Sequence, residues 1–186
     1  MTIAQSMLPE LDHEAANTRR LLERVPDEIF GWKPHDKCGT TQWLVSHLAS
    51  LPGWACSTLE TSEFDFAPVG GEPVKLPTYA TTAEAVAAFD GFVAAARELL
   101  AKTSDEALLE PWALLKGGEV MFKMPRVAVL RGFILNHLIH HRAQLGMYLR
   151  LKDIPLPAIY GPSADEGASG LPIAGPGPDW SGRTAS

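Results

Sequence analysis

The chain has 186 residues, of which 22 are acidic and 16 are basic, and its formal net charge at pH 7 is -6. This length suits one domain with a sizeable core, and no run of Lys or Arg exceeds two residues, which argues against nucleic-acid and membrane-surface partners. The sequence shows neither a signal peptide nor an apolar stretch of the roughly 20 residues that a transmembrane helix needs, so we expect a cytoplasmic protein.

The first half of the chain predicts two helices. Apolar residues at helical spacing indicate a first helix over residues 8–25, ended by Pro26. Pro9 belongs to an early turn, or marks a kink if the helix begins before it. A loop over residues 31–39 leads to a second amphipathic helix, which we expect to run from about residue 41 to about residue 59.

The second half predicts two more helices. Prolines and glycines recur over residues 60–80, which indicates a long connection, and the sequence Thr81-Thr82-Ala83-Glu84 then opens a third helix that ends near Lys102. Two glycines in the middle of residues 112–124 suggest a short β-hairpin or an extended excursion. A fourth helix follows over residues 127–151, and four such helices with long crossover connections predict an all-α four-helix bundle.

The C-terminal end changes in character. Residues 152–166 are irregular but contain enough apolar side chains to pack on the bundle. Gly, Pro and Ser dominate residues 167–186, which predicts a flexible tail that adds nothing to the core. The expected organisation is therefore one bundle domain over residues 1–166 and a tail over residues 167–186.

Histidines interrupt the apolar faces of two predicted helices. His137 and His141 lie one turn apart in the fourth helix, about 40° from each other around its axis. Both replace core-facing apolar residues, although a buried imidazole without a partner is unfavourable. His47 has the same kind of position in the second helix. These three nitrogen donors predict a divalent metal site with positions left open for water or substrate.

Other interpretations of these residues stay open. The histidines could form a solvated patch, or be core residues held by carbonyl groups and water. Neither cysteine is expected to be a ligand or a nucleophile. Cys38 falls in a turn, and Cys56 lies about half a turn around the second helix from His47.

Several segments together resemble the DinB-like family of metal-binding four-helix bundles. The resemblance covers residues 8–166, and one small departure is Ala143, where many members have Gly. It implies that His47, His137 and His141 bind the metal. It is carried by Trp32-Lys-Pro, Leu51-Pro-Gly-Trp54, His137-Leu-Ile-His-His-Arg-Ala-Gln144 and Pro157-Ala-Ile-Tyr-Gly-Pro-Ser-Ala-Asp-Glu166.

The resemblance also implies a function. Characterised relatives include enzymes that use a low-molecular-weight thiol, so we expect a thiol-dependent S-transferase or isomerase with Zn²⁺ or Ni²⁺, a small-molecule substrate and a homodimeric state. His140, about 100° around the helix from His141, would have a supporting or packing role. Gln144 could orient a ligand or a bound water. Trp54 and Trp112 could line the pocket, although large aromatic residues more often belong to the core.

Three alternatives to this enzyme are retained. The chain could be a non-catalytic metal-binding protein of the stress response, or a bundle whose histidines bind no metal. It could also be a metal-dependent hydrolase, since three histidines and a water suit hydrolysis. The absence of an acidic residue near the histidines on either helix counts against hydrolysis, because a general base is then lacking.

Overall fold

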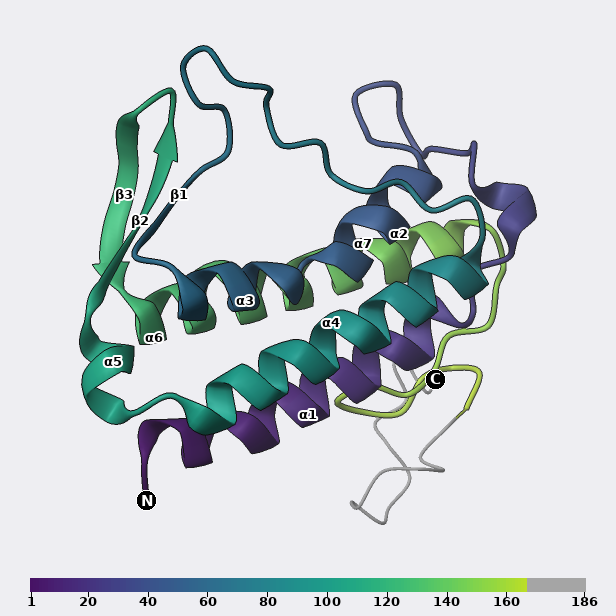
Figure 1. Cartoon of the computed structure of the whole chain (residues 1–186). Coiled ribbons are helices and arrows are strands. Elements are labelled where there is room, and N and C mark those ends of the chain that lie inside the picture. Colours follow the sequence, from purple (N-terminus) through teal and green to yellow (C-terminus); the bar gives the residue numbers. More distant parts are fainter. Residues whose placement is uncertain (167–186) are drawn as a thin grey trace, which may run out of the picture.

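The computed structural model describes residues 1–166, so the predicted tail over residues 167–186 lies outside the described part of the chain. The structure is mainly helical and carries a small three-stranded sheet at one end (Figure 1). In chain order, the elements are α1 (Ile3–Leu22), η1 (Asp27–Ile29), α2 (Thr41–Ser50), α3 (Gly53–Glu60), β1 (Glu63–Asp65), α4 (Thr82–Lys102), α5 (Asp105–Leu109), β2 (Pro111–Lys116), β3 (Glu119–Pro125), α6 (Arg126–Ala128), η2 (Val129–Leu135) and α7 (Asn136–Leu151).

Four helical runs lie side by side: α1, α2 with α3, α4, and α6 with η2 and α7 (Figure 1). Helix α4 packs on α1, α2 and α3, and α7 packs on α1 and α2. One core cluster joins α2 to α7 through side chains that include Leu44, Leu48, Leu138 and Leu145, each at most 1% exposed. Burial of these apolar side chains fixes the distance between the two helices that carry the histidines.

The sheet corrects the expected all-α class. Strands β2 and β3 form the predicted hairpin, and its turn uses Gly117 (φ 63°) and Gly118 (φ 78°), a conformation that glycine adopts without strain. The strand β1 pairs with β2 in parallel, within the segment predicted as a plain connection. The Asp65 carboxylate holds this arrangement because it accepts backbone N–H groups from Ala67, Gly117 and Gly118.

The second predicted helix is two helices in the structure. Helix α2 ends at Ser50 and α3 begins at Gly53, with Pro52 between them. Proline has no backbone N–H to continue the hydrogen-bond ladder, so the helix is interrupted there. Pro9 behaves differently, since it lies inside α1, which begins at Ile3 after a capping box formed by Thr2 and Gln5.

The fourth predicted helix contains a π-helical segment, η2. It ends at Leu135, and the next residue, Asn136, donates its backbone N–H to the carbonyl group of Arg131, five residues earlier. Such segments are rare and are often found at functional sites. Here the π-helix ends two residues before His137.

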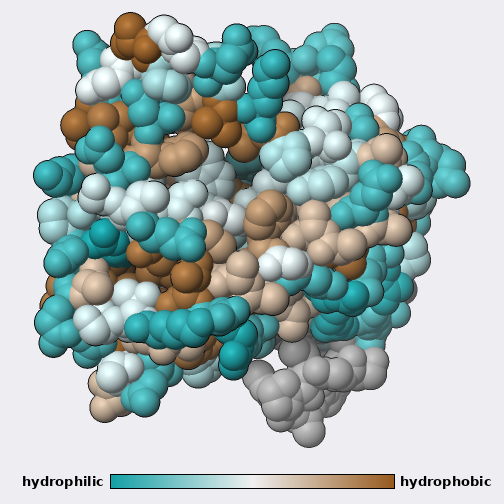
Figure 2. Space-filling view, viewed as in Figure 1, coloured by the Kyte–Doolittle hydropathy of each residue, from teal (hydrophilic) through white to brown (hydrophobic). Residues whose placement is uncertain are grey.

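Residues 152–166 pack on the helices, as expected from their apolar content. Glu166 pairs with Arg20 of α1 and with Arg24, which follows α1, and the guanidinium group of Arg20 also donates to the carbonyl group of Ala158. Hydrophilic residues cover most of the face shown in Figure 2, with smaller apolar patches between them. No helix within residues 1–166 combines the length and the apolar character needed to cross a membrane.

Candidate metal centre

Three histidine side chains meet between α2 and α7. His47 comes from α2, His137 and His141 come from α7, and one nitrogen of each lies within 4.8 Å of the other two. The Nε2 atom of His137 is 3.3 Å from that of His47 and 2.8 Å from that of His141. A tetrahedral ion at the usual Zn–N bond length needs donors about 3.3 Å apart. The His47–His137 distance matches this spacing, and the His137–His141 distance approaches it.

Local sequence explains this convergence. The hydroxyl group of Thr40 accepts the backbone N–H of Trp43 and caps α2 about two turns before His47. In α7 the four-residue spacing of His137 and His141 puts both rings on one face. Because α2 packs on α7 at this level, the third ring reaches the other two across the helix interface.

The surroundings keep the three rings neutral. Burial, together with repulsion from His141 and His137, lowers the pKa of His47 to about 4. Burial also lowers the pKa of His137, with added repulsion from His141 and His140. Burial again lowers the pKa of His141, although its hydrogen bond with Gln144 acts in the opposite direction. Neutral imidazole is the form that binds metal ions.

Gln144 determines which nitrogen of His141 is free to bind. The Nδ1 atom of His141 lies 2.7 Å from the side-chain oxygen of Gln144, an acceptor, so the ring donates from Nδ1 and its Nε2 carries a lone pair. This lone pair points toward the Nε2 atoms of His47 and His137. With all three rings in the tautomer that leaves a lone pair on Nε2, these nitrogens would face one shared cation, so the residues present fit a divalent metal ion.

The other two rings have fewer supporting contacts. The Nδ1 atoms of His47 and His137 are buried and have no hydrogen-bond partner of normal geometry among the described residues. The Phe133 carbonyl group is nevertheless near enough to His137 to raise its pKa slightly against the effect of burial. The strongest supporting contact in the cluster is therefore the one between His141 and Gln144.

His140 lies beside the cluster and not in it. Its side chain is exposed, its ring centroid is 5.0 Å from that of His141, and it is absent from the group of converging donors. Its position one residue before His141 turns it about 100° around the helix axis. His140 is therefore not one of the three converging donors, and its supporting or packing role stays a prediction.

Trp43 covers the cluster, and the sequence analysis did not identify it. Its indole ring stacks on the ring of His47, with centroids 5.1 Å apart and planes 9° apart, and it lies nearly perpendicular to the ring of His141. The four-residue spacing of Trp43 and His47 in α2 was the available signal. Gly39 allows this arrangement, because a Cβ atom there would lie 2.5 Å from the indole ring.

The two tryptophans proposed for the pocket have other environments. Trp112 is fully buried in the second core cluster and donates its Nε1–H to the hydroxyl group of Thr61, so its expected role as a pocket wall is wrong. Apolar burial on β2 explains this position. Trp54 packs edge-on against Phe133, which in turn contacts His137, and is therefore one ring removed from the cluster.

The protein's own thiols do not join the cluster. Cys38 is exposed in the loop before α2, and Cys56 packs at the margin of the second core cluster. Burial and the nearby Glu60 raise the pKa of the Cys56 thiol, which disfavours the thiolate. Within residues 1–166 the group of potential metal donors contains histidines alone.

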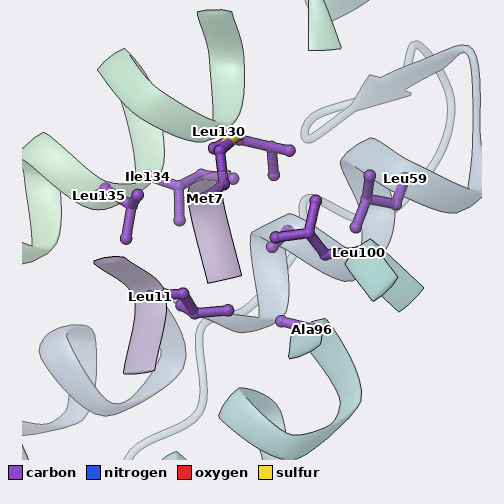
Figure 3. Close-up of a pocket in the computed structure, with 9 residues that line it drawn as sticks. Met7, Leu11, Leu59, Ala96, Leu100, Leu130, Ile134 and Leu135 are labelled. Atoms are coloured by element: carbon purple, nitrogen blue, oxygen red, sulfur yellow. The ribbon is translucent and has the colours of Figure 1, made fainter. Parts of the chain in front are cut away.

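A separate apolar void lies deeper in the protein, between α1, α3, α4 and η2 (Figure 3). Its volume is about 20 Å³, roughly room for one water molecule, and its lining is aliphatic. Without polar partners it would not hold an ordered water. We interpret it as a packing gap next to the π-helix and not as a binding site.

A mainly helical fold with three converging histidines defines a class of candidate metalloproteins, and sequence comparison assigns the family. The model of the DinB superfamily matches residues 10–145, so the chain belongs to the DinB superfamily. A search of curated proteins gave no match.

Two solved structures share the fold. A DinB-like protein from Bacillus cereus ATCC 10987 is 19% identical with a TM-score of 0.64, and the match covers 86% of this chain and 98% of that one. A DinB-like protein from Bacillus subtilis, YjoA, is 15% identical with a TM-score of 0.61, and the match covers 82% of this chain and 95% of that one. At these identities the likeness concerns the fold.

Proposed function

We propose that this member of the DinB superfamily is a divalent-metal-dependent enzyme that uses a low-molecular-weight thiol, as an S-transferase or an isomerase. His47, His137 and His141 would hold Zn²⁺ or Ni²⁺. The observation that carries the proposal is the convergence of three Nε2 atoms, with the lone pair of His141 directed inward by Gln144.

The number and type of donors favour a reactive site over a structural one. Structural zinc sites are usually closed by four protein ligands, whereas catalytic sites have three and leave a position for water or substrate. The described donor group here has three members. His47 and His137 are only partly buried, so a small molecule can approach the cluster.

The thiol chemistry follows from the same donor set. A bound divalent ion lowers the pKa of a coordinated thiol, which can then react as the thiolate at neutral pH. Since neither Cys38 nor Cys56 belongs to the cluster, the sulfur would come from a separate molecule. In this proposal Gln144 keeps His141 in its binding tautomer, and Trp43 shields one face of His47 from water.

Hydrolysis is less well supported. A hydrolase with three histidine ligands needs a general base that deprotonates the attacking water. Among the described residues, no Asp or Glu hydrogen bonds to any of the three rings or joins the donor group. Turnover of a reactive electrophile with a panel of small thiols would distinguish an enzyme from a non-catalytic metal-binding protein.

The test of thiol activation uses protein loaded with Co²⁺. A sulfur ligand adds a strong near-ultraviolet charge-transfer band that oxygen and nitrogen ligands do not produce. We expect this band on addition of a small thiol and expect its loss in His47→Ala. The control variants Cys38→Ser and Cys56→Ser should keep it. Absence of the band with every thiol at millimolar concentration would contradict the proposal.

A further inference from the structure

We propose that one reactant of this enzyme carries a carboxylate, and that Lys75 recognises this group in a cavity beside His47. The inference rests on the proposed function, because it assumes that a substrate or thiol binds next to the histidine cluster. It identifies the chemical class of that molecule and a residue that selects it.

The cavity lies between α2 and the long connection that precedes α4. Its volume is about 390 Å³, within the range of small-molecule sites. Because His47 belongs both to the cavity lining and to the histidine cluster, a molecule in the cavity lies beside the candidate metal centre. The lining residues are Trp43, Ser46 and His47 from α2, and Lys75, Leu76, Pro77 and Thr78 from the connection.

Hydrogen bonds hold the outer wall of this cavity against α2. The Gln42 side chain donates to the backbone carbonyl group of Tyr79 (2.9 Å), and the backbone N–H of Tyr79 donates to the Ser46 hydroxyl group (3.1 Å). At the other end, the backbone N–H of Val74 donates to the Phe66 carbonyl group (2.8 Å). Residues 75–78 are thus fixed at both sides, which preforms the cavity.

The cavity lining carries one positive side chain, although the chain as a whole is acidic. That side chain is the exposed Lys75, the one Lys or Arg among the lining residues, and no Asp or Glu contributes. Within residues 1–166 the Lys75 ammonium group forms no ion pair. A carboxylate or a phosphate complements such a charge, and we assign the carboxylate as the smaller of the two groups.

The rest of the lining suits an apolar or unsaturated body attached to that carboxylate. Trp43 and Leu76 are 49% and 42% exposed, and both line this cavity, so they offer apolar surface to a ligand there. A neighbouring cavity of about 160 Å³ shares Lys75, Leu76 and Pro77 and is lined by Trp54. Lys75 therefore lies between two partly apolar cavities. A ligand whose carboxylate pairs with Lys75 would place its apolar part against Trp43 in one cavity or Trp54 in the other.

The test compares matched ligands that differ in charge. On Co²⁺-loaded full-length protein, the charge-transfer band measures the affinity for 3-mercaptopropionate relative to that for 3-mercaptopropan-1-ol. Without any thiol, cobalt-induced broadening of phenyl proton resonances measures binding of 3-phenylpropionate relative to 3-phenylpropan-1-ol. The first pair reports a carboxylate on the thiol, and the second reports a carboxylate on the other reactant.

The variants are Lys75→Met, Lys75→Arg and the matched control Lys102→Met, at the far end of α4 (Figure 1).

In at least one pair, Lys75→Met should lower the preference for the carboxylate about fivefold, the upper range for a solvent-accessible ion pair. Lys75→Arg and Lys102→Met should keep the preference. An unchanged preference in Lys75→Met for both pairs, or an equal loss in Lys102→Met, would overturn the inference. If thiols bind cobalt but Lys75 has no effect, the proposed function survives and this inference fails. If no thiol binds, the phenyl pair still decides the role of Lys75.

Discussion

The hydrogen bond between His141 and Gln144 gives the sharpest prediction about the candidate metal centre. Replacing Gln144 by Leu removes the oxygen that accepts the Nδ1–H of His141 at 2.7 Å and leaves the helix backbone unchanged. The ring can then exchange tautomers, so its preference for a lone pair on Nε2 is weakened. Loss of such a supporting contact typically weakens metal binding 10- to 100-fold.

The structure places this case at the lower end of that range. Gln144 is exposed, so water can replace part of the lost hydrogen bond, whereas His141 itself is only 9% exposed. We therefore expect Gln144→Leu to weaken Zn²⁺ binding about tenfold. Gln144→Glu should bind at least as tightly as the natural protein, because a carboxylate is a stronger acceptor for the imidazole N–H.

The assay is a competition titration of metal-free protein against a chromophoric zinc chelator at pH 7.5. His140→Leu is the matched control, since it changes a neighbouring exposed residue that is outside the donor group. This variant should bind zinc as the natural protein does. An effect below twofold in Gln144→Leu, or an equal loss in His140→Leu, would refute the role assigned to Gln144.

Three further predictions concern stability. Glu14→Gln should destabilise the protein by about 3–5 kcal/mol in urea unfolding, because Arg142, with a side chain 4% exposed, would lose its buried partner; a cost below 1 kcal/mol would contradict this. Metal-free protein should lose thermal stability as the pH falls from about 6.5 to about 4, because the unfolded chain protonates its histidines before His47, whose pKa is about 4, takes up a proton in the fold. If the melting temperature, measured with a chelator present, stays constant or rises as the pH falls, the lowered pKa of His47 is contradicted. A chain ending at Glu166 should unfold within a few degrees of the full-length protein, and a much lower midpoint would mean that residues 167–186 contribute to the core.

Patterns with a regular period were predictable from the sequence. The three-to-four-residue spacing of apolar side chains located the helices, and Gly117-Gly118 located the hairpin. The positions of His47, His137 and His141 on core-facing sides of two helices predicted that they would lie together, as they do in the structure. Each of these features follows from short-range geometry of the backbone.

Features that depend on contacts between distant segments were missed. Strand β1 has three residues, too few for a recognisable alternation, and it exists because β2 and the Asp65 carboxylate hold it. The π-helix η2 leaves no signature in an apolar sequence. The stacking of Trp43 on His47 was within reach of helical spacing, but its contact with His141 depends on how α2 packs on α7.

The buried pair Arg142–Glu14 was also beyond sequence reasoning. Arg142 follows His141 directly, and its guanidinium group pairs with Glu14 of α1 at 2.7 Å while Tyr160 donates its hydroxyl to the same carboxylate. The three residues are separated by long stretches of chain, so no spacing rule connects them. Together they tie α1, α7 and the segment after α7 to one another behind the candidate metal centre.

The central claim is that His47, His137 and His141 form one metal site, and metal stoichiometry tests it most directly. Full-length protein without a histidine tag would be analysed by inductively coupled plasma mass spectrometry after equilibration with Zn²⁺ and desalting. The account predicts about one ion per chain, close to none in His47→Ala, His137→Ala and His141→Ala, and an unchanged value in His140→Ala. Retention of the ion in His141→Ala together with its loss in His140→Ala, or no bound ion in the natural protein, would contradict it.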